Sequence, residues 1–177
     1  MVYQCKPSTP YFSHPMNTAV RFDSAAAVHQ AVGSEICVTD WLTIGQDRID
    51  KFAEATGDFQ WIHVDRARAK AESPYGGTIA HGFLTLSLLG KFYEDYLMPA
   101  MPFCDMGLNY GLNKVRFTQP VREGSRVRAR FVLAKVEDVP GGLQLTSTVT
   151  TEIEGVAKPA CIAESVVRRY FKKGTAA

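Results

Sequence analysis

GFLTLSLLGKFYEDYL, residues 82–97, is the stretch that decides the fold. Its apolar side chains cover most of the circumference of a helix, whereas a surface helix carries a single apolar stripe. Sixteen residues give about 24 Å of helix, which is too short to cross a bilayer. The pattern therefore predicts a buried helix from Gly82 to Leu97, long enough to lie along a sheet.

The C-terminal third of the sequence is predicted to form that sheet. Apolar and polar residues alternate there with period two, and short turns are expected at residues 140–142 and at Gly155. The predicted strands are residues 126–133, 143–153 and 160–171. Strands joined by short turns form an antiparallel meander, and its apolar face needs a cover. The helix from Gly82 is that cover, which predicts a single α+β domain with a sheet wrapped around a central apolar helix.

The rest of the chain is less regular. A strand is predicted over residues 36–44, a helix over 46–56 ended by Gly57, and a short helix over 66–71. Residues 1–34 show no sustained period. We therefore predict an N-terminal arm, residues 1–31, attached loosely or drawn over the body, followed by one domain over residues 32–177.

The composition is typical of a globular protein, with 46% hydrophobic and 21% charged residues. A net charge of +2 and the lack of a dense Lys/Arg block give no reason to expect a nucleic-acid partner. We expect neither a secretory leader nor a membrane span. The four cysteines lack C-x-x-C spacing, and reduced thiols in a cytoplasmic enzyme are the better interpretation. They are Cys5, Cys37, Cys104 and Cys161.

Asp58 and His63 are candidate catalytic residues. On a regular helix five positions correspond to a rotation of about 140°, and on a strand an odd spacing places side chains on opposite faces. The two converge only if the chain bends after Gly57. A carboxylate and an imidazole brought together can hold one water molecule, with Trp61 and Ile62 as walls. Taken singly, Asp58 is more simply explained as a turn residue and His63 as a structural histidine.

Gly82 stands at the expected start of the central helix. N–H groups in a first helical turn have no intrahelical partner, so one of them can donate to an oxyanion that forms in a transition state. The absence of a Cβ lets a carbonyl oxygen approach closely. Close packing of helix on sheet would require glycine equally well. Beside it, His81 either lines the site or bonds to a loop carbonyl, and the second is the simpler interpretation.

Other chemistry finds less support. A metal site built from His63, Asp65 and His81 has neither HExxH spacing nor paired Cys and His ligands, and Asp65 is explained by capping the short helix. Phosphate-loop and nucleophile-elbow motifs are absent. A set of arginines is predicted to form a solvated strand face, or alternatively to meet substrate phosphates. They are Arg116, Arg126, Arg128 and Arg130.

Three segments together resemble a known family. They are Gly57-Asp58-x-Gln60-x-Ile62-His63-x-Asp65, then YGGTIAHG at residues 75–82, and RFTQPVREG at residues 116–124. The combination resembles the MaoC-like dehydratases, which are the (R)-specific enoyl-CoA hydratases with a hot-dog fold, and looks most like their nodulation-protein-N-like branch. The similarity covers about residues 32–171. The family more often has Asn where Gln60 stands and Pro where Trp61 stands, which puts the acyl-chain preference in doubt.

The resemblance implies a catalytic role for Asp58, His63 and the amide of Gly82, which would polarise a thioester carbonyl. Residues expected to contact substrate are Gln60, Trp61, Ile62, Ala80 and His81. It also implies a homodimer that acts on an acyl-CoA or acyl-carrier thioester, without a metal ion or cofactor. The expected reaction is reversible syn hydration of a trans-2-enoyl thioester to the (3R)-hydroxyacyl thioester. A hot-dog thioesterase and a non-catalytic acyl-thioester binding protein are the alternatives.

Overall fold

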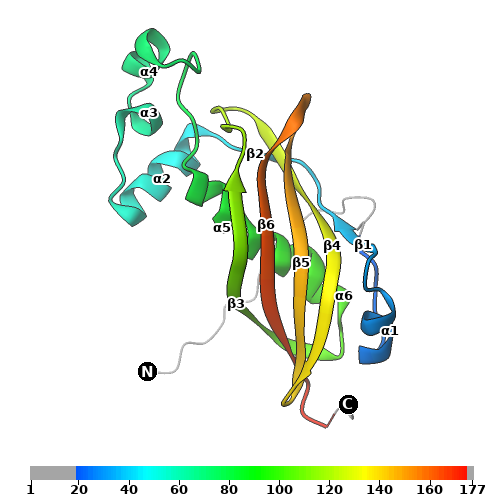
Figure 1. The fold of residues 1–177 in the computed structure, drawn as a ribbon. Coiled ribbons are helices and arrows are strands. Elements are labelled where there is room, and N and C mark those ends of the chain that lie inside the picture. Colours follow the sequence, from blue (N-terminus) through cyan, green and yellow to red (C-terminus); the bar gives the residue numbers. More distant parts are fainter. Residues whose placement is uncertain (1–18, 175–177) are drawn as a thin grey trace, which may run out of the picture.

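The computed structural model describes residues 19–174, and its six strands form one antiparallel sheet (Figure 1). The strand order is β1-β4-β5-β6-β3, and β2 also pairs with β4. The strands are β1 (Glu35–Val38), β2 (Leu42–Thr43), β3 (Cys104–Phe117), β4 (Arg126–Val139), β5 (Gly142–Ile153) and β6 (Val156–Phe171). The predicted meander of β4, β5 and β6 is confirmed. Its turns contain Gly141 and Gly155, whose φ angles of 75° and 74° suit glycine.

The central helix lies against one face of this sheet (Figure 1). Helix α5 (Gly82–Phe92) continues through a turn of π-helix, η1 (Tyr93–Leu97), into α6 (Met98–Ala100). Leu84, Leu88 and Phe92 are at most 4% exposed, and burial of such side chains contributes roughly 1.5–3 kcal/mol each. The predicted helix over residues 82–97 is therefore confirmed, with its last five residues wound more widely.

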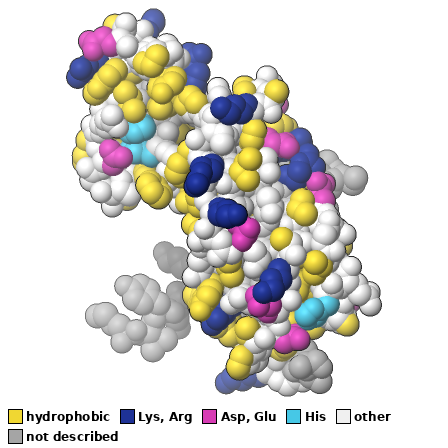
Figure 2. Space-filling view, viewed as in Figure 1, with side chains coloured by type: hydrophobic (Ala, Val, Ile, Leu, Met, Phe, Trp, Pro, Cys, Tyr) yellow, Lys and Arg dark blue, Asp and Glu magenta, His cyan; other side chains and the backbone are white. Residues whose placement is uncertain are grey.

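The two faces of β4 differ as its alternation predicts. Val127, Ala129, Phe131 and Leu133 are fully buried under the helix. On the other face, Arg126 pairs with Glu154, Arg128 with Glu152, and Arg130 with both Glu152 and Glu35. Basic and acidic side chains accordingly lie next to one another on this side of the molecule (Figure 2). Carboxylates thus already pair with these three arginines, as expected for a solvated strand face.

Strand β3 was not predicted from the sequence. It is an edge strand, paired with β6. All ten residues from Asp105 to Lys114 are exposed, so burial does not alternate along it. Because alternation is the signal of a half-buried strand, this segment gives no such signal. The predicted strand over residues 36–44 is also corrected: it consists of two short strands, β1 and β2, separated by an irregular link.

The first described residues pack against the domain. Helix α1 (Ala25–Gln30) is capped by Ser24, whose hydroxyl accepts a hydrogen bond from the Ala27 N–H at 3.2 Å. Phe22 and Val28 are 3% and 0% exposed and belong to the core. The sequence did not predict this helix. The predicted arm thus lies partly on the body, and its first 18 residues fall outside the described part of the chain.

Three helices extend beyond the end of the sheet (Figure 1). They are α2 (Gln46–Thr56), α3 (Trp61–Val64) and α4 (Arg66–Glu72). Gly57 ends α2 in the left-handed conformation, with φ of 74°, and Asp65 caps α4 by accepting from the Arg68 N–H at 2.9 Å. Both predicted helix ends are confirmed, while α3 was not predicted.

Three of the four cysteines lie among the described residues. Cys37, Cys104 and Cys161 are buried and unpaired, as predicted. Burial raises the pKa of Cys37 to about 12 and that of Cys161 to about 11, which disfavours their thiolates. Within residues 19–174, no helix has the length and apolar character needed to cross a membrane.

Candidate active site

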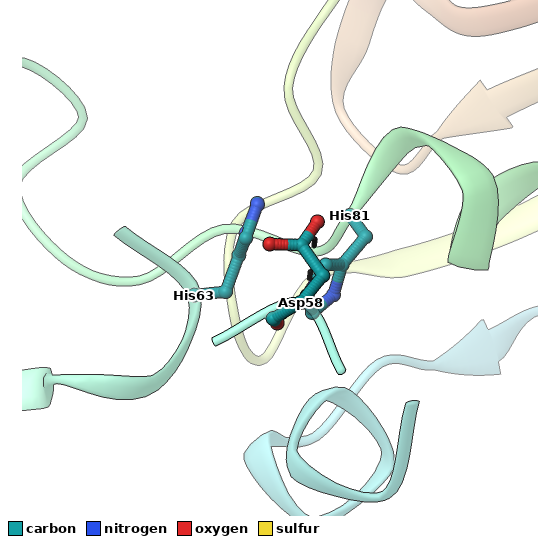
Figure 3. Close-up of side chains that lie close together, drawn as sticks. All are labelled: Asp58, His63 and His81. Carbon is teal, nitrogen blue, oxygen red and sulfur yellow. Dashed lines mark hydrogen bonds and ion pairs between the residues drawn. The ribbon is translucent and has the colours of Figure 1, made fainter. Parts of the chain in front are cut away.

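The chain turns sharply between α2 and α3, and this turn brings Asp58 and His63 together. Gly57 reverses the direction of the backbone, and the Asp58 carboxylate accepts a hydrogen bond from the Gln60 N–H at 3.3 Å. The side chains of Asp58, His63 and His81 then face one another (Figure 3). One potential ligand atom from each lies within 4.8 Å of the other two. The bend that the spacing of Asp58 and His63 requires is therefore present.

His63 is held in one tautomer by its surroundings. The residue is only 6% exposed, and its Nδ1–H donates to the Ile79 carbonyl at 2.7 Å. The Gln46 side chain donates to the His63 carbonyl at 2.7 Å and so fixes the main chain. Because Nδ1 carries the proton, Nε2 keeps its lone pair and is free to accept a proton.

The pKa of His63 is lowered from its ordinary value of 6.5, chiefly because burial disfavours the charged imidazolium. The neighbouring His81 lowers this pKa further. The hydrogen bond to the Ile79 carbonyl and the charge of Asp58 act in the opposite direction without overcoming burial. His63 is therefore a neutral base at pH 7.

His81 contacts both Asp58 and His63 and holds them in place. It is 3% exposed, and its Nε2–H donates to the Asp58 main-chain carbonyl at 3.0 Å. Its ring stacks on that of His63, with centroids 3.8 Å apart and planes at 27°. Among the described residues its Nδ1 has no hydrogen-bond partner. The simpler interpretation, a bond to a loop carbonyl, is the arrangement found.

Gly82 lies at the wall of a pocket beside His63. The pocket has a volume of about 330 Å³, and Ala80 and Thr85 also line it. His81, the N-cap of α5, makes no side-chain capping bond, so the first-turn N–H groups depend on other acceptors. A Cβ at position 82 would lie 3.0 Å from the Phe117 ring. The geometry thus fits both interpretations of this glycine, oxyanion donor and close contact.

The other predicted contact residues are distributed unevenly. Ala80 lines the pocket, whereas Gln60, Trp61 and Ile62 do not. Gln60 is exposed, the Trp61 ring packs 4.3 Å from the Arg68 guanidinium, and the Ile62 carbonyl accepts from the Ile79 N–H. Much of the wall comes from residues whose part in the site was not foreseen individually: Tyr75, Thr85, Phe117, Thr118, Gln119, Pro120 and Val121. Thr85 had a readable signal, because it is a polar residue one turn after Gly82 in a largely apolar helix.

The same cluster is also the place where a metal ion would have to bind. His63 Nδ1 and His81 Nε2 are both committed to main-chain carbonyls. The remaining potential ligands are the Asp58 carboxylate, His63 Nε2 and His81 Nδ1, without the HExxH or paired Cys and His spacing of common zinc sites. Asp65, considered in the sequence as a third ligand, caps α4 instead. The cluster therefore has the atoms to hold either a water molecule or a metal ion.

The lowered pKa of His63 predicts the pH dependence of turnover. If neutral His63 is the base, kcat/KM for hydration is expected to stay level as the pH falls to 6.5 and to decline only at lower pH. Below pH 6.5 the unfolded chain also binds a proton at this residue before the native chain does, so stability falls as well. A pH–rate profile, with NMR titration of the imidazole, measures both effects. An acid limb above pH 6.5 would contradict this assignment.

A pair of double variants separates the two roles of Gly82. Phe117→Ala removes the ring that a Cβ would meet. In that background Gly82→Ala is expected to match its parent, whereas Gly82→Pro is expected to lose about 100- to 1000-fold in kcat, because it lacks the N–H. Proline suits a first helical position, and His81, with φ −58° and ψ 140°, has the backbone that precedes proline. Equal activity of the two double variants would exclude an N–H role.

Comparison with solved structures defines the fold class of the protein. The (R)-hydratase PhaJ1 of Pseudomonas aeruginosa matches with a TM-score of 0.62 and 21% identity over 80% of this chain and 83% of that one. The (R)-hydratase of A. caviae matches with a TM-score of 0.61 and 24% identity over 77% and 94%. At these identities the likeness shows the fold alone, and that fold is the hot-dog fold expected from the sequence.

The family follows from sequence comparison. A family model described as the MaoC like domain matches residues 27–155, and the chain belongs to this family. It is 51% identical to 3-hydroxyacyl-thioester dehydratase Z of Mycobacterium tuberculosis over 148 residues, which are 83% of this chain and 96% of that protein. It is also 51% identical to nodulation protein N of Rhizobium leguminosarum bv. viciae, over 84% of this chain and 92% of that protein.

Proposed function

We propose that the protein catalyses the reversible hydration of trans-2-enoyl thioesters to (3R)-3-hydroxyacyl thioesters. The observation that carries the proposal is the meeting of the Asp58 carboxylate with the His63 ring, beside a pocket walled by Gly82. A relative that is 51% identical over 96% of its own length is named a 3-hydroxyacyl-thioester dehydratase, which supports the same reaction.

The spacing of the polar atoms suits one water molecule. Two hydrogen bonds of about 2.8 Å at a tetrahedral angle join atoms about 4.5 Å apart. The atoms of the cluster lie within 4.8 Å of one another. A water held by Asp58 and His63 donates one proton to each, and its lone pair is left to attack carbon.

In the hydration direction His63 Nε2 takes a proton from this water as its oxygen bonds to C3. The electrons of the double bond move toward the thioester oxygen, where the Gly82 N–H donates to the developing negative charge. The imidazolium then returns its proton to C2 on the same face, which gives syn addition. Asp58 orients the water and stabilises the imidazolium. Positioning supplies a further share of the rate enhancement.

Hydration of crotonyl-CoA tests this reaction directly. The expected result is loss of the conjugated enoyl absorbance, no release of free thiol, and an R configuration at C3 of the product. A thioesterase would release thiol, and a non-catalytic binding protein would leave the absorbance unchanged. Either of these results, obtained with folded protein across short and long substrates, would refute the proposed hydratase.

We also propose that the protein is a homodimer acting on acyl-CoA or acyl-carrier thioesters in the cytoplasm. Edge strand β3 exposes four large apolar side chains on its surface, and such an edge favours pairing with a second copy. They are Met106, Leu108, Tyr110 and Leu112, each at least 45% exposed. The three free, buried cysteines support a reducing compartment. Sedimentation equilibrium measures the assembly state.

A further inference from the structure

A series of hollows runs along one side of the central helix, starting at the active site. The first, of about 330 Å³, is lined by Gly82 and Thr85. The second, of about 250 Å³, is lined by Leu86 and Gly90, and the third, of about 130 Å³, by Gly90 and Tyr93. These positions follow the i, i+3, i+4, i+8, i+11 spacing of a single helical stripe. The second and third hollows share Gly90 and Asn109, and the row of three, here called the groove, leads away from His63 along the helix.

Edge strand β3 forms the opposite wall and runs antiparallel to the helix. The Phe117 ring meets Gly82 at one end, and Gly107 faces Met98 at the other. Midway, Gly90 on the helix and Gly111 on the strand both border the second hollow. Apart from the neighbouring main chain, no atom of the described residues lies within 4 Å of the place where a Cβ would stand at either glycine. Both walls thus leave space at the middle of the groove.

Arg169 closes the far end of the groove. It lines the third hollow and is only 3% exposed. Its Nη2 donates to the Met98 carbonyl at 3.3 Å, and its Nη1 contacts the sulfur of the same residue. Its Nε has no hydrogen-bond partner in the described part of the chain. Within residues 19–174, no carboxylate oxygen lies within 4.0 Å of this guanidinium, whereas the half-buried Arg128 and Arg130 both pair with Glu152.

An unpaired buried cation is costly. Burial lowers the pKa of Arg169, and the nearby Glu94, Tyr93 and Cys104 only partly offset this effect. A guanidinium is nevertheless charged at any ordinary pH. The Glu94 carboxylate lines the same hollow but does not come within 4.0 Å of this charge. Such a guanidinium is stabilised when a carboxylate binds it in a forked geometry.

The length of the groove sets the size of a fitting ligand. From Gly82 to Tyr93 the helix rises about 17 Å. A fully extended alkyl chain advances about 3.8 Å for every three bonds, so roughly 13 bonds span this distance. A thioester carbonyl at Gly82 would place carbons about 12 to 16 of its acyl chain beside Arg169.

We infer that the groove takes an acyl chain of about 12 to 16 carbons whose far end carries a carboxylate, which Arg169 binds. The inference rests on the proposed hydratase reaction and adds a substrate class to it: enoyl thioesters with an ω-carboxyl group. The apolar middle of the groove holds the methylene chain, and the buried guanidinium distinguishes the anionic end from a methyl end.

Kinetics on matched substrates test the inference. Trans-2-enoyl-CoA esters of 4, 8, 12 and 14 carbons are compared with the ω-carboxyl forms of the two longest. For wild type, the ω-carboxyl substrates are expected to have at least about tenfold higher kcat/KM than methyl-ended substrates of equal length, mainly through KM. Arg169→Met is expected to abolish or reverse this preference while keeping turnover of the four-carbon substrate measurable.

Arg168→Met is the matched control. Arg168 is the neighbouring residue on the opposite face of β6, where it donates to Gln144 at 3.0 Å and packs on the Tyr110 ring. This variant is expected to keep the wild-type preference. Thermal unfolding checks that Arg169→Met is folded. If the variant is not folded, the comparison of ω-carboxyl and methyl-ended substrates with the wild-type protein still tests the inference.

The outcomes separate the two proposals. If wild type hydrates short enoyl-CoA esters but shows no advantage for ω-carboxyl substrates, the role of Arg169 is wrong and the hydratase stands. That result would also be obtained if a carboxylate of a second subunit pairs with Arg169. If no enoyl-CoA of any length is hydrated, the hydratase proposal itself fails.

Discussion

Replacing His63 by Gln is expected to lower kcat for crotonyl-CoA hydration about 1000-fold, within the usual range for loss of a general base. Gln keeps most of the buried volume and can still donate to the Ile79 carbonyl, but it has no lone pair basic enough to take a proton from water. KM is expected to change much less than kcat, because the loss falls on the chemical step. Steady-state kinetics at a raised concentration of the variant enzyme, with substrate still in excess, measure kcat and KM.

An exposed histidine provides the control for this variant. His29 lies in α1 and bonds to Asp138 at 3.0 Å, and nothing connects it to the pocket. His29→Gln is expected to keep wild-type turnover. A folded His63→Gln protein that retains a tenth of wild-type kcat would show that the imidazole is not the base.

Replacing Asp58 by Asn is expected to lower kcat by a similar factor, about 100- to 1000-fold. The carboxylate orients the water and stabilises the imidazolium, and Asn retains the shape but not the charge. The fold is expected to persist, because the Asp58 side chain is 53% exposed. Moreover, the bond from His81 goes to the main-chain carbonyl of Asp58, which the substitution leaves in place.

Asp65→Asn is the matched control for Asp58→Asn. Asp65 lies close in sequence, but its carboxylate caps α4, and Asn caps a helix about as well as Asp. The control is expected to retain both stability and turnover. Unfolding curves and kcat are measured for both variants. Comparable activity losses in the two would indicate a general charge effect and not a specific role of Asp58.

The parts of the fold that the sequence predicts are those with strong local periodicity. Helix α5 is predictable because apolar residues cover its circumference, and β4 and β5 are predictable because apolar and polar residues alternate along them. A buried helix and a half-buried strand both leave such patterns in a sequence. Strand β3 leaves none, since neither side of it is buried among the described residues. Helix α3 has four residues, too few to show a period.

The site was predictable to a similar extent. The five-residue spacing of Asp58 and His63 required a bend, and Gly57 supplied a reason for one. The sequence offered no means of seeing that Trp61 packs on Arg68, because that contact depends on how α3 meets α4. The groove wall on β3 and the position of Arg169 depend on long-range strand pairing, which local patterns do not encode.

The segment that carries α2, α3 and α4 stands apart from the sheet and returns to it near the isolated bridge between Ile79 and Arg122 (Figure 1). Doubling the length of such an excursion adds only about 0.6 kcal/mol of closure entropy. Insertions and deletions are therefore expected to accumulate here during evolution, outside the turn that carries Asp58 and His63, while the sheet that it joins stays constant. Proteins that descend from one ancestral gene can in this way acquire different substrate specificities while the sheet is retained.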